Sequence, residues 1–285
     1  MVVLSPSSFP PLLREINDPP EKLYLEGTLP GPELAWLTVV GARQASSYGK
    51  DICESLIFGL AGYPIVIVSG LAHGIDGIAH RAALLARLKT VAVPGSGLSE
   101  KVLYPAWHRD LAKKIITQGG ALLSEYEPET PAAKWTFPKR NRIMAGLSQA
   151  VLVIEAKKDS GSLITAHLAL DYNRDVATVP GRIDSPTSAG PHLLLKSGAA
   201  LITESADIIE LLGLQKITNE KPRPALTSDE ERVINVLANA SLRRDEICEK
   251  TGLTMSAVNS LVMKLLVLGL VEEREGIVSV AFDRN

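Results

Sequence analysis

The clearest pattern in the chain lies at residues 36–76, which read WLTVVGARQASSYGKDICESLIFGLAGYPIVIVSGLAHGID. Two short aliphatic runs, Leu37–Val40 and Ile65–Val68, are each followed by a loop that contains glycine. A helix-length stretch, Lys50–Leu60, lies between them. The runs do not alternate between apolar and polar residues, so they fit strands that are buried on both faces of a parallel sheet.

The same unit recurs through the following residues. Further aliphatic runs lie at Thr90–Val93, Ala121–Leu123, Ala150–Ile154, Val176–Val179 and Ala199–Thr203. They alternate with helix-length stretches at Ile75–Arg87, Asp110–Thr117, Leu163–Tyr172 and Ala206–Leu212. Strands separated by amphipathic helices predict the α/β class, with a doubly wound, mostly parallel, Rossmann-like sheet.

The pattern also divides the chain into parts. We predict an N-terminal extension at 1–35 that packs on the main domain, a Rossmann-like domain at 36–213, a linker at 214–226 and a small winged-helix domain at 227–285. The linker is predicted from LQKITNEKPRPA, which holds two prolines and mixed charges. Beyond it, three helical patterns precede VEEREGIVSV, a predicted hairpin, and this order is typical of a winged helix.

Composition narrows the function classes. The 285 residues carry a net charge of −2, so a site for nucleic acid would need a local cluster of cations. No apolar run reaches the roughly 18–20 residues of a membrane span, and the N-terminus lacks a signal-peptide pattern. Cys53 and Cys248 lie far apart with no CxxC partner. We therefore expect a cytoplasmic protein with reduced thiols and no membrane contact.

Glycine-bearing loops follow the first two strands, at the edge where ligands bind parallel sheets. Gly41 and Arg43 follow the first strand, and Ser69, Gly70 and Gly74 follow the second. Glycine lets the backbone approach an anion, a helix N-terminus offers free N–H groups, and arginine binds phosphate with two donors. Tight strand–helix turns with a surface arginine would look the same, so the local sequence leaves both interpretations open.

The densest positive stretch of the chain lies in WTFPKRNRIMAGLS, residues 135–148. Its candidate phosphate-binding residues are Lys139, Arg140, Asn141 and Arg142. Cations neutralise phosphates, and the preceding rings of Trp135 and Phe137 can stack on unpaired bases. The alternative is that both rings are buried, as most large rings are.

A third loop, KKDSGS at residues 157–162, places Gly161 and Ser162 at a predicted helix start behind two lysines. It lacks the GK[ST] ending of a Walker A motif. The stretch PGSG at 94–97 lacks the third glycine of a dinucleotide fingerprint, because Glu100 stands there. We therefore predict a phosphate-binding loop and no cofactor.

Catalytic and metal sites are not predicted. His73, Asp76 and His80 are spaced as a rough stripe, but no third strong ligand lies near them, so we expect no metal site. Glu125 and Glu155 end strands at the ligand edge, where capping or pairing with an arginine is favoured over acid–base work. No nucleophile, base and orienting group can be assembled. The sequence thus favours a protein that is not an enzyme.

Several of these segments occur together in one known family. GARQASSYG, SGLAHGIDGIAH, LLSEYEP, FPKRNRIMAGLS, EAKKDSGSLITA, VPG and KSGAALI resemble, in this order, the DprA/Smf DNA-processing family over about residues 10–213. The resemblance implies binding of single-stranded DNA without strong sequence preference, a homodimer, and loading of the recombinase RecA during natural transformation. The positions that match the family's DNA pocket are Arg43, the Ser69–Gly74 loop, Lys139, Arg140, Asn141 and the Gly161–Ser162 helix start.

Two loops depart from that pattern, whereas the C-terminal region resembles the family's winged helix but is acidic. The stretch SGLSEKVLYP and His108 replace the usual Gly-x-Asp and the asparagine after Tyr-Pro, and Pro191-His192 stand where relatives carry asparagine. From Ala225 to Asn285 there are seven Lys and Arg against ten Asp and Glu, a net charge of −3. Such a region is a poor partner for DNA, so we expect a protein contact or an auxiliary role.

Two other function classes remain open. A nucleotide N-glycosidase of the lysine-decarboxylase-like (phosphoribohydrolase) superfamily shares this predicted fold, but its catalytic glutamate would correspond to Thr165 here. A transcriptional regulator would place the winged helix on duplex DNA, which the acidic C-terminal region disfavours.

Overall fold

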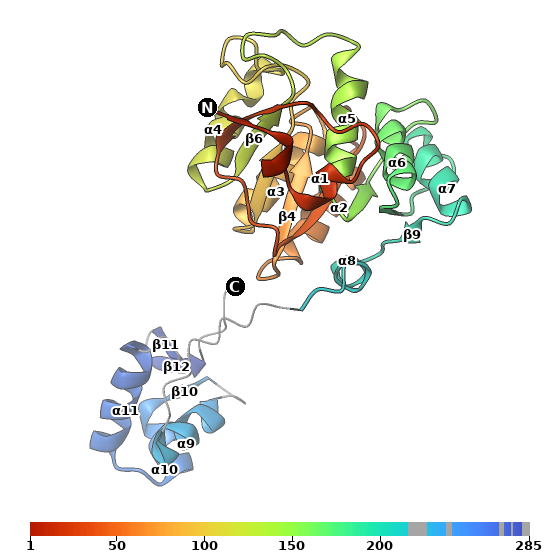
Figure 1. The fold of residues 1–285 in the computed structure, drawn as a ribbon. Helices are drawn as coiled ribbons and strands as arrows, with labels where there is room; N and C mark the ends of the chain where they lie inside the picture. The colour runs from red at the N-terminus through yellow and green to blue at the C-terminus, as the bar shows by residue number, and fades with distance from the viewer. Residues whose placement is uncertain (216–226, 238–240, 268–270, 275, 281–285) are drawn as a thin grey trace. The chain divides into compact units, whose positions relative to one another are not determined.

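The computed structural model describes residues 1–215, 227–237, 241–267, 271–274 and 276–280. The chain divides into two compact units, Met1–Ile217 and Thr218–Asn285 (Figure 1). Residues 216–226 of the predicted linker lie outside the described residues. Each unit is therefore described by itself.

The first unit is built on a nine-stranded sheet with the order β1-β2-β6-β5-β4-β3-β7-β8-β9. The seven strands from β3 to β9 pair in parallel, which confirms the predicted doubly wound sheet. These strands are β3 (Ala35–Val40), β4 (Ile65–Ser69), β5 (Lys89–Ala92), β6 (Ala121–Ser124), β7 (Ala150–Val153), β8 (Asp175–Thr178) and β9 (Ala200–Leu201).

The first 35 residues contribute two strands to this sheet. They are β1 (Val2–Leu4) and β2 (Leu23–Gly27), and β2 pairs antiparallel with β6. Leu23 and Tyr24 are buried. The prolines that suggested an extension lie between the two strands, so β2 covers the edge that β6 would otherwise expose.

Helices cover both faces of the sheet. One face packs against α2 (Ser47–Phe58), α3 (Ile75–Leu85) and α8 (Ser205–Leu211), and the other against α1 (Pro11–Arg14), α5 (Thr136–Leu147) and α6 (Gly161–Asp171). Two further helices are α4 (Arg109–Thr117) and α7 (Ala189–Lys196). No helix within the described residues has the length and apolar character needed to cross a bilayer.

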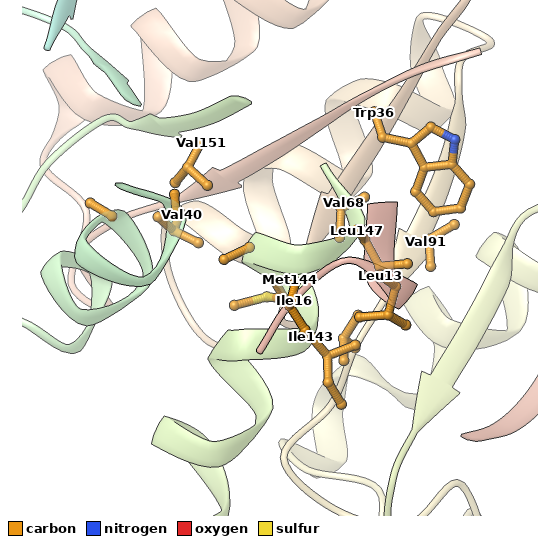
Figure 2. Packing of buried hydrophobic residues seen from close by; sticks show 14 of the residues in the cluster. Leu13, Ile16, Trp36, Val40, Val68, Val91, Ile143, Met144, Leu147 and Val151 are labelled. Atoms are coloured by element: carbon orange, nitrogen blue, oxygen red, sulfur yellow. The ribbon is translucent and has the colours of Figure 1, made fainter. Parts of the chain in front are cut away.

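The N-terminal segment holds α5 in place. Leu13 and Ile16 pack against Ile143 and Leu147 of α5 in the buried cluster of Figure 2. A Cβ atom at Gly146 would lie 2.9 Å from Cγ2 of Ile16 and 3.0 Å from Cδ1 of Leu13. The absence of a side chain at this glycine therefore allows α1 to approach α5, the helix that carries the basic residues.

The second unit is the predicted winged helix. Its described elements are α9 (Ser228–Leu237), β10 (Leu242–Arg243), α10 (Arg244–Thr251), α11 (Met255–Val267), β11 (Val271–Arg274) and β12 (Ile277–Val280). The strands pair antiparallel in the order β10-β12-β11, so the predicted hairpin is present and gains a short third strand. Val233, Ile247, Val258, Val262 and Leu265 form its core.

Candidate functional site

A pocket of about 660 Å³ opens where the strand order of the sheet reverses. The strands β4, β5 and β6 lie on one side of β3, and β7, β8 and β9 lie on the other. The pocket is lined by the loop after β3, the loop after β7 and the first turns of α5. The crevice at such a switch point, beyond the carboxyl ends of the strands, is where open α/β sheets bind ligands.

The pocket brings together six of the eleven predicted site residues. Those that line it are Gly41, Arg43, Arg140, Asn141, Gly161 and Ser162. Those that the structure does not place on its surface are Ser69, Gly70, Gly74, Lys139 and Arg142. Sequence reasoning did not select Lys134, Phe137 and Lys157 as site residues, although they also line the pocket.

The phase of α5 explains which basic residues face the pocket. Phe137, Arg140, Asn141 and Met144 all line it, and they are spaced as one stripe of a helix. Lys139 and Arg142 lie on a different stripe. This spacing was visible in the sequence and would have separated the two groups of cations.

Arg43 is an exposed cation at the pocket wall. Its guanidinium lies 4.9 Å from the centre of the Phe137 ring. No carboxylate within the described residues pairs with it. A guanidinium that lies over a ring can keep its N–H donors, which point outward in the plane of the guanidinium, free for an anion. The contact with Phe137 therefore positions the arginine and leaves its donors available.

The start of α6 also lines the pocket. Ser160 caps the helix, and its hydroxyl accepts a hydrogen bond from the backbone N–H of Ser162 at 3.4 Å. A Cβ atom added to Gly161 would meet no atom within 4 Å, so open space lies in front of this residue. Asn141 ties α5 to this turn, because its Nδ2 donates to the carbonyl of Gly161 at 3.2 Å. A helix N-terminus carries a partial positive charge and N–H groups without intrahelical acceptors.

Arg140 is a buried cation at the base of the pocket. It donates to the carbonyl of Val93, and its Nε atom has no hydrogen-bond partner within the described part of the chain. Burial lowers the pKa of Arg140 to about 10, while the nearby carboxylate of Asp76 acts in the opposite direction. Asp76 itself accepts hydrogen bonds from the backbone N–H groups of Gly70 at 3.1 Å and Ala72 at 3.4 Å. At neutral pH the arginine is therefore charged.

The loop after β4 shapes the pocket from behind. A Cβ atom at Gly70 would lie 1.8 Å from Nη1 of Arg140, so this glycine makes room for the guanidinium. Gly74 has φ +70° and ψ −127°, and a Cβ atom there would lie 2.1 Å from the carbonyl oxygen of Ala42. The buried hydroxyl of Ser69 donates to the carbonyl of Val39 at 2.6 Å. Ser69 and Gly74 therefore pack the loop after β4 against β3 and the loop that follows it, and Gly70 packs the same loop against Arg140.

Lys139 and Arg142 face Glu125 rather than the pocket. The buried Arg142 side chain pairs with Glu125 and also donates to the carbonyl of Asp18 at 2.6 Å. The Nζ atom of Lys139 lies 3.7 Å from Oε1 of Glu125. Arg142 therefore links α5, the loop after β6 and the N-terminal segment.

The remaining acidic and imidazole groups are held by structural contacts. Glu155 accepts hydrogen bonds from the backbone N–H and hydroxyl of Ser46, at 2.9 and 2.6 Å, and from the hydroxyl of Thr187 at 2.9 Å. His80 is buried beside the hydroxyl of Thr90 at 2.7 Å, and burial lowers its pKa to about 3. The described residues contain no cluster of three or more His, Cys, Asp or Glu side chains that could hold a metal ion.

Family models cover both units of the chain. Residues 1–213 match the model of DNA recombination-mediator protein A, and residues 218–276 match that of the DprA winged helix domain. The chain is 39% identical to protein Smf of Escherichia coli over 274 residues, which cover 92% of this chain and 72% of that protein. It is 40% identical to a putative DNA processing protein DprA of Mycobacterium tuberculosis, of which it spans 62%.

Solved structures give the same result. DNA processing protein A of Streptococcus pneumoniae superposes with a TM-score of 0.68 at 40% identity, covering 73% of each chain. DNA processing protein A of Helicobacter pylori, studied for its single-stranded DNA binding mode, superposes with a TM-score of 0.64 at 32% identity. That match covers 74% of this chain and 94% of the other. The chain therefore belongs to the DprA/Smf family of DNA-processing proteins.

Proposed function

We propose that the pocket binds the phosphate backbone of single-stranded DNA without strong sequence preference. The observation that carries the proposal is the guanidinium of Arg43, which has no ion pair within the described residues, lies over Phe137 and lines the same pocket as the N-terminus of α6. A guanidinium and a helix N-terminus that line one pocket suit the binding of a phosphate there. The similarity to the Helicobacter pylori protein, studied for its binding of single-stranded DNA, supports this assignment.

The site residues divide into contact and support groups. Arg43, Lys134 and Lys157 supply exposed positive charge, while the start of α6 at Gly161 and Ser162 supplies the partial positive charge of a helix N-terminus. Arg140 adds a fixed charge at the base, with the donor of Asn141 beside it. Ser69, Gly70 and Gly74 shape the wall, and Lys139 and Arg142 stabilise α5. Asp159, which also lines the pocket, weakens the net positive field.

We also propose that the pocket binds its ligand without catalysing a reaction. Thr165, which stands where a phosphoribohydrolase would carry its glutamate, is buried and lines the pocket. Glu125 pairs with Arg142 through Oε1, and the carboxylate of Glu155 accepts hydrogen bonds at the start of α2 and from Thr187. Incubation with AMP should therefore release no adenine.

The winged helix is proposed to contact protein rather than DNA. Arg244 makes a two-point ion pair with Glu273, with Nη2 at 2.6 Å from the carboxylate oxygen. Lys264, on α11, lies 2.6 Å from the carboxylate of Glu230. Cations that already have a partner contribute little to phosphate binding, because displacing the carboxylate costs the energy of the pair.

Family membership supports a proposal on partners beyond DNA. We propose a cytoplasmic homodimer that acts in natural transformation and recombination and loads RecA onto the bound strand. The strand β9 lies at one end of the sheet, and Leu193 and Leu201 are exposed near it. An outer strand with exposed leucines is a suitable surface for a second copy.

The test is an equilibrium titration of labelled oligo-thymidine with the wild-type chain, Arg43→Ala and Arg87→Ala. Arg87 is an exposed arginine between α3 and β5, at the sheet edge away from the pocket. Loss of a charge-assisted contact at Arg43 should weaken binding by about 1–3 kcal/mol, or roughly 5- to 150-fold. Arg87→Ala should change little. Equal affinity of all three proteins would refute the proposed site.

A further inference from the structure

A row of aromatic rings leads away from the pocket. It starts at Phe137 and continues through Tyr104, His73 and Trp107, three residues that we call the aromatic strip. Ring centres are 5.8 Å apart for Phe137 and Tyr104, 6.2 Å for Tyr104 and His73, and 4.1 Å for His73 and Trp107. The strip comes from the loops after β4 and β5, so it lies along the same sheet edge as the pocket.

The strip is exposed, yet its rings are held in place. Trp107 is 71% exposed and Tyr104 is 42% exposed. The indole Nε1 of Trp107 donates to Nδ1 of His73 at 2.9 Å, and the two rings lie against one another. A large apolar ring that is fixed in solvent is unusual, because burial of such a ring stabilises a fold. The contact with His73 therefore holds the exposed indole in one orientation.

Positive charge lies near His108, whose ring neighbours the strip. Arg81 is exposed on α3, and no ion pair with it occurs in the part of the chain that the structure describes. Burial and the charge of Arg81 lower the pKa of His108, whose ring lies 5.7 Å from that of His73. Rings next to an unpaired cation match a ligand that alternates flat bases with phosphates.

We propose that the aromatic strip stacks bases of the DNA strand that leaves the pocket, and that it extends the binding site across the loops after β4 and β5. This proposal rests on the proposed function, since the strip continues the surface that Arg43 and Phe137 begin. Stacking on rings tolerates any base, which agrees with binding that lacks sequence preference.

The first experiment measures affinity against oligonucleotide length. Oligo-thymidines from about 4 to about 16 nucleotides span the range that one binding unit covers. Trp107→Ala should bind the shortest oligomers like the wild type and lose roughly 5- to 100-fold on the longest, because only these reach the strip. Trp107→Phe, which keeps a ring, should retain most of the affinity.

The matched control is Phe58→Ala. Phe58 is 43% exposed at the end of α2, at the sheet edge away from the pocket, and its loss should leave all lengths unchanged. Equal urea midpoints for the Trp107→Ala and Phe58→Ala proteins would show that both fold. Should Trp107→Ala unfold, the Trp107→Phe protein and the fluorescence experiment below still decide the question.

The second experiment uses tryptophan fluorescence. The chain has three tryptophans, and Trp36 is buried. In the full-length Trp135→Phe protein, Trp107 is therefore the exposed indole. Long oligo-thymidine should quench its emission by stacking, whereas short oligo-thymidine that fills only the pocket should not.

The outcomes separate the strip from the pocket. If Arg43→Ala weakens binding at every length while Trp107→Ala matches the wild type and no quenching occurs, the strip proposal is overturned and the pocket remains. If Trp107→Ala instead changes the oligomeric state without changing DNA affinity, the strip is a protein contact and the proposal is likewise overturned. If Arg43→Ala has no effect at any length, the proposed function itself fails.

Discussion

The substitution Gly70→Ala tests how the loop after β4 supports the pocket. An added Cβ atom would lie 1.8 Å from Nη1 and 2.4 Å from Cζ of Arg140, so the buried guanidinium must move. Its hydrogen bond to the carbonyl of Val93 would then be lost. A hydrogen bond to a charged group contributes about 1.5–3 kcal/mol, so we expect the free energy of unfolding to fall by about that amount.

Urea unfolding followed by tryptophan emission measures this loss in the relevant unit, because Trp36, Trp107 and Trp135 all lie in residues 1–217. The midpoint should fall by about 1 M. DNA affinity should fall as well, since Arg140 would leave the base of the pocket.

The cause can be separated with Arg140→Met and the double variant. If Gly70 matters because it makes room for the guanidinium, Gly70→Ala should cost under about 0.5 kcal/mol in the Arg140→Met background, and it should no longer affect DNA affinity. The reasoning is refuted if Gly70→Ala costs the same with and without Arg140. If the Gly70 backbone contacted phosphate directly, Gly70→Ala would weaken DNA binding by the same factor with and without Arg140.

Two further predictions concern other buried ionisable side chains. Arg142→Met should lower the free energy of unfolding by about 1–3 kcal/mol, because Glu125 loses its arginine partner. The affinity for oligo-thymidine should change less than about threefold. A larger loss of affinity would place Arg142 at the ligand. The pKa of His80 is lowered to about 3 by burial, so the unfolded chain binds this proton at a higher pH than the folded chain. The contribution of the neutral His80 to stability is present above about pH 6.5 and is lost as the pH falls toward 3. In urea titrations at stepped pH, the His80→Gln protein should therefore lose stability less steeply over that range than the wild type. Parallel plots of stability against pH for the two proteins would contradict the lowered pKa of His80.

The sequence was sufficient to predict most of the main fold. Runs such as Ile65–Val68 lie in strands that are buried on both faces of the sheet. Such strands do not alternate between apolar and polar residues, so the sequence pattern predicted this environment. The strands β1 and β2 escaped prediction because prolines separate them and because their pairing is long-range: Leu25 of β2 pairs with Leu123 of β6. Such pairing depends on the finished sheet rather than on local residues.

The location of the candidate site was predicted, but not which of its residues line the pocket and which support the fold around it. The gathering of the Arg43 and Gly161 loops followed from parallel topology alone. The separation of Arg140 from Arg142 depends on the spacing of residues along α5 and not on residue type, and this spacing could have been read from the sequence. The role of Gly70 required knowing that Arg140, 70 residues further along the chain, lies against it. Local sequence shows that a glycine allows close approach but not which group approaches.

The salt dependence of oligo-thymidine affinity tests the central claim most directly, namely that unpaired cations at the pocket hold a polyanion. The logarithm of the association constant should fall linearly with the logarithm of the salt concentration. The magnitude of this negative slope should be smaller by about 0.7 in Arg43→Ala and unchanged in Arg87→Ala. A flat dependence, or the same slope in all three proteins, would contradict a phosphate contact at Arg43.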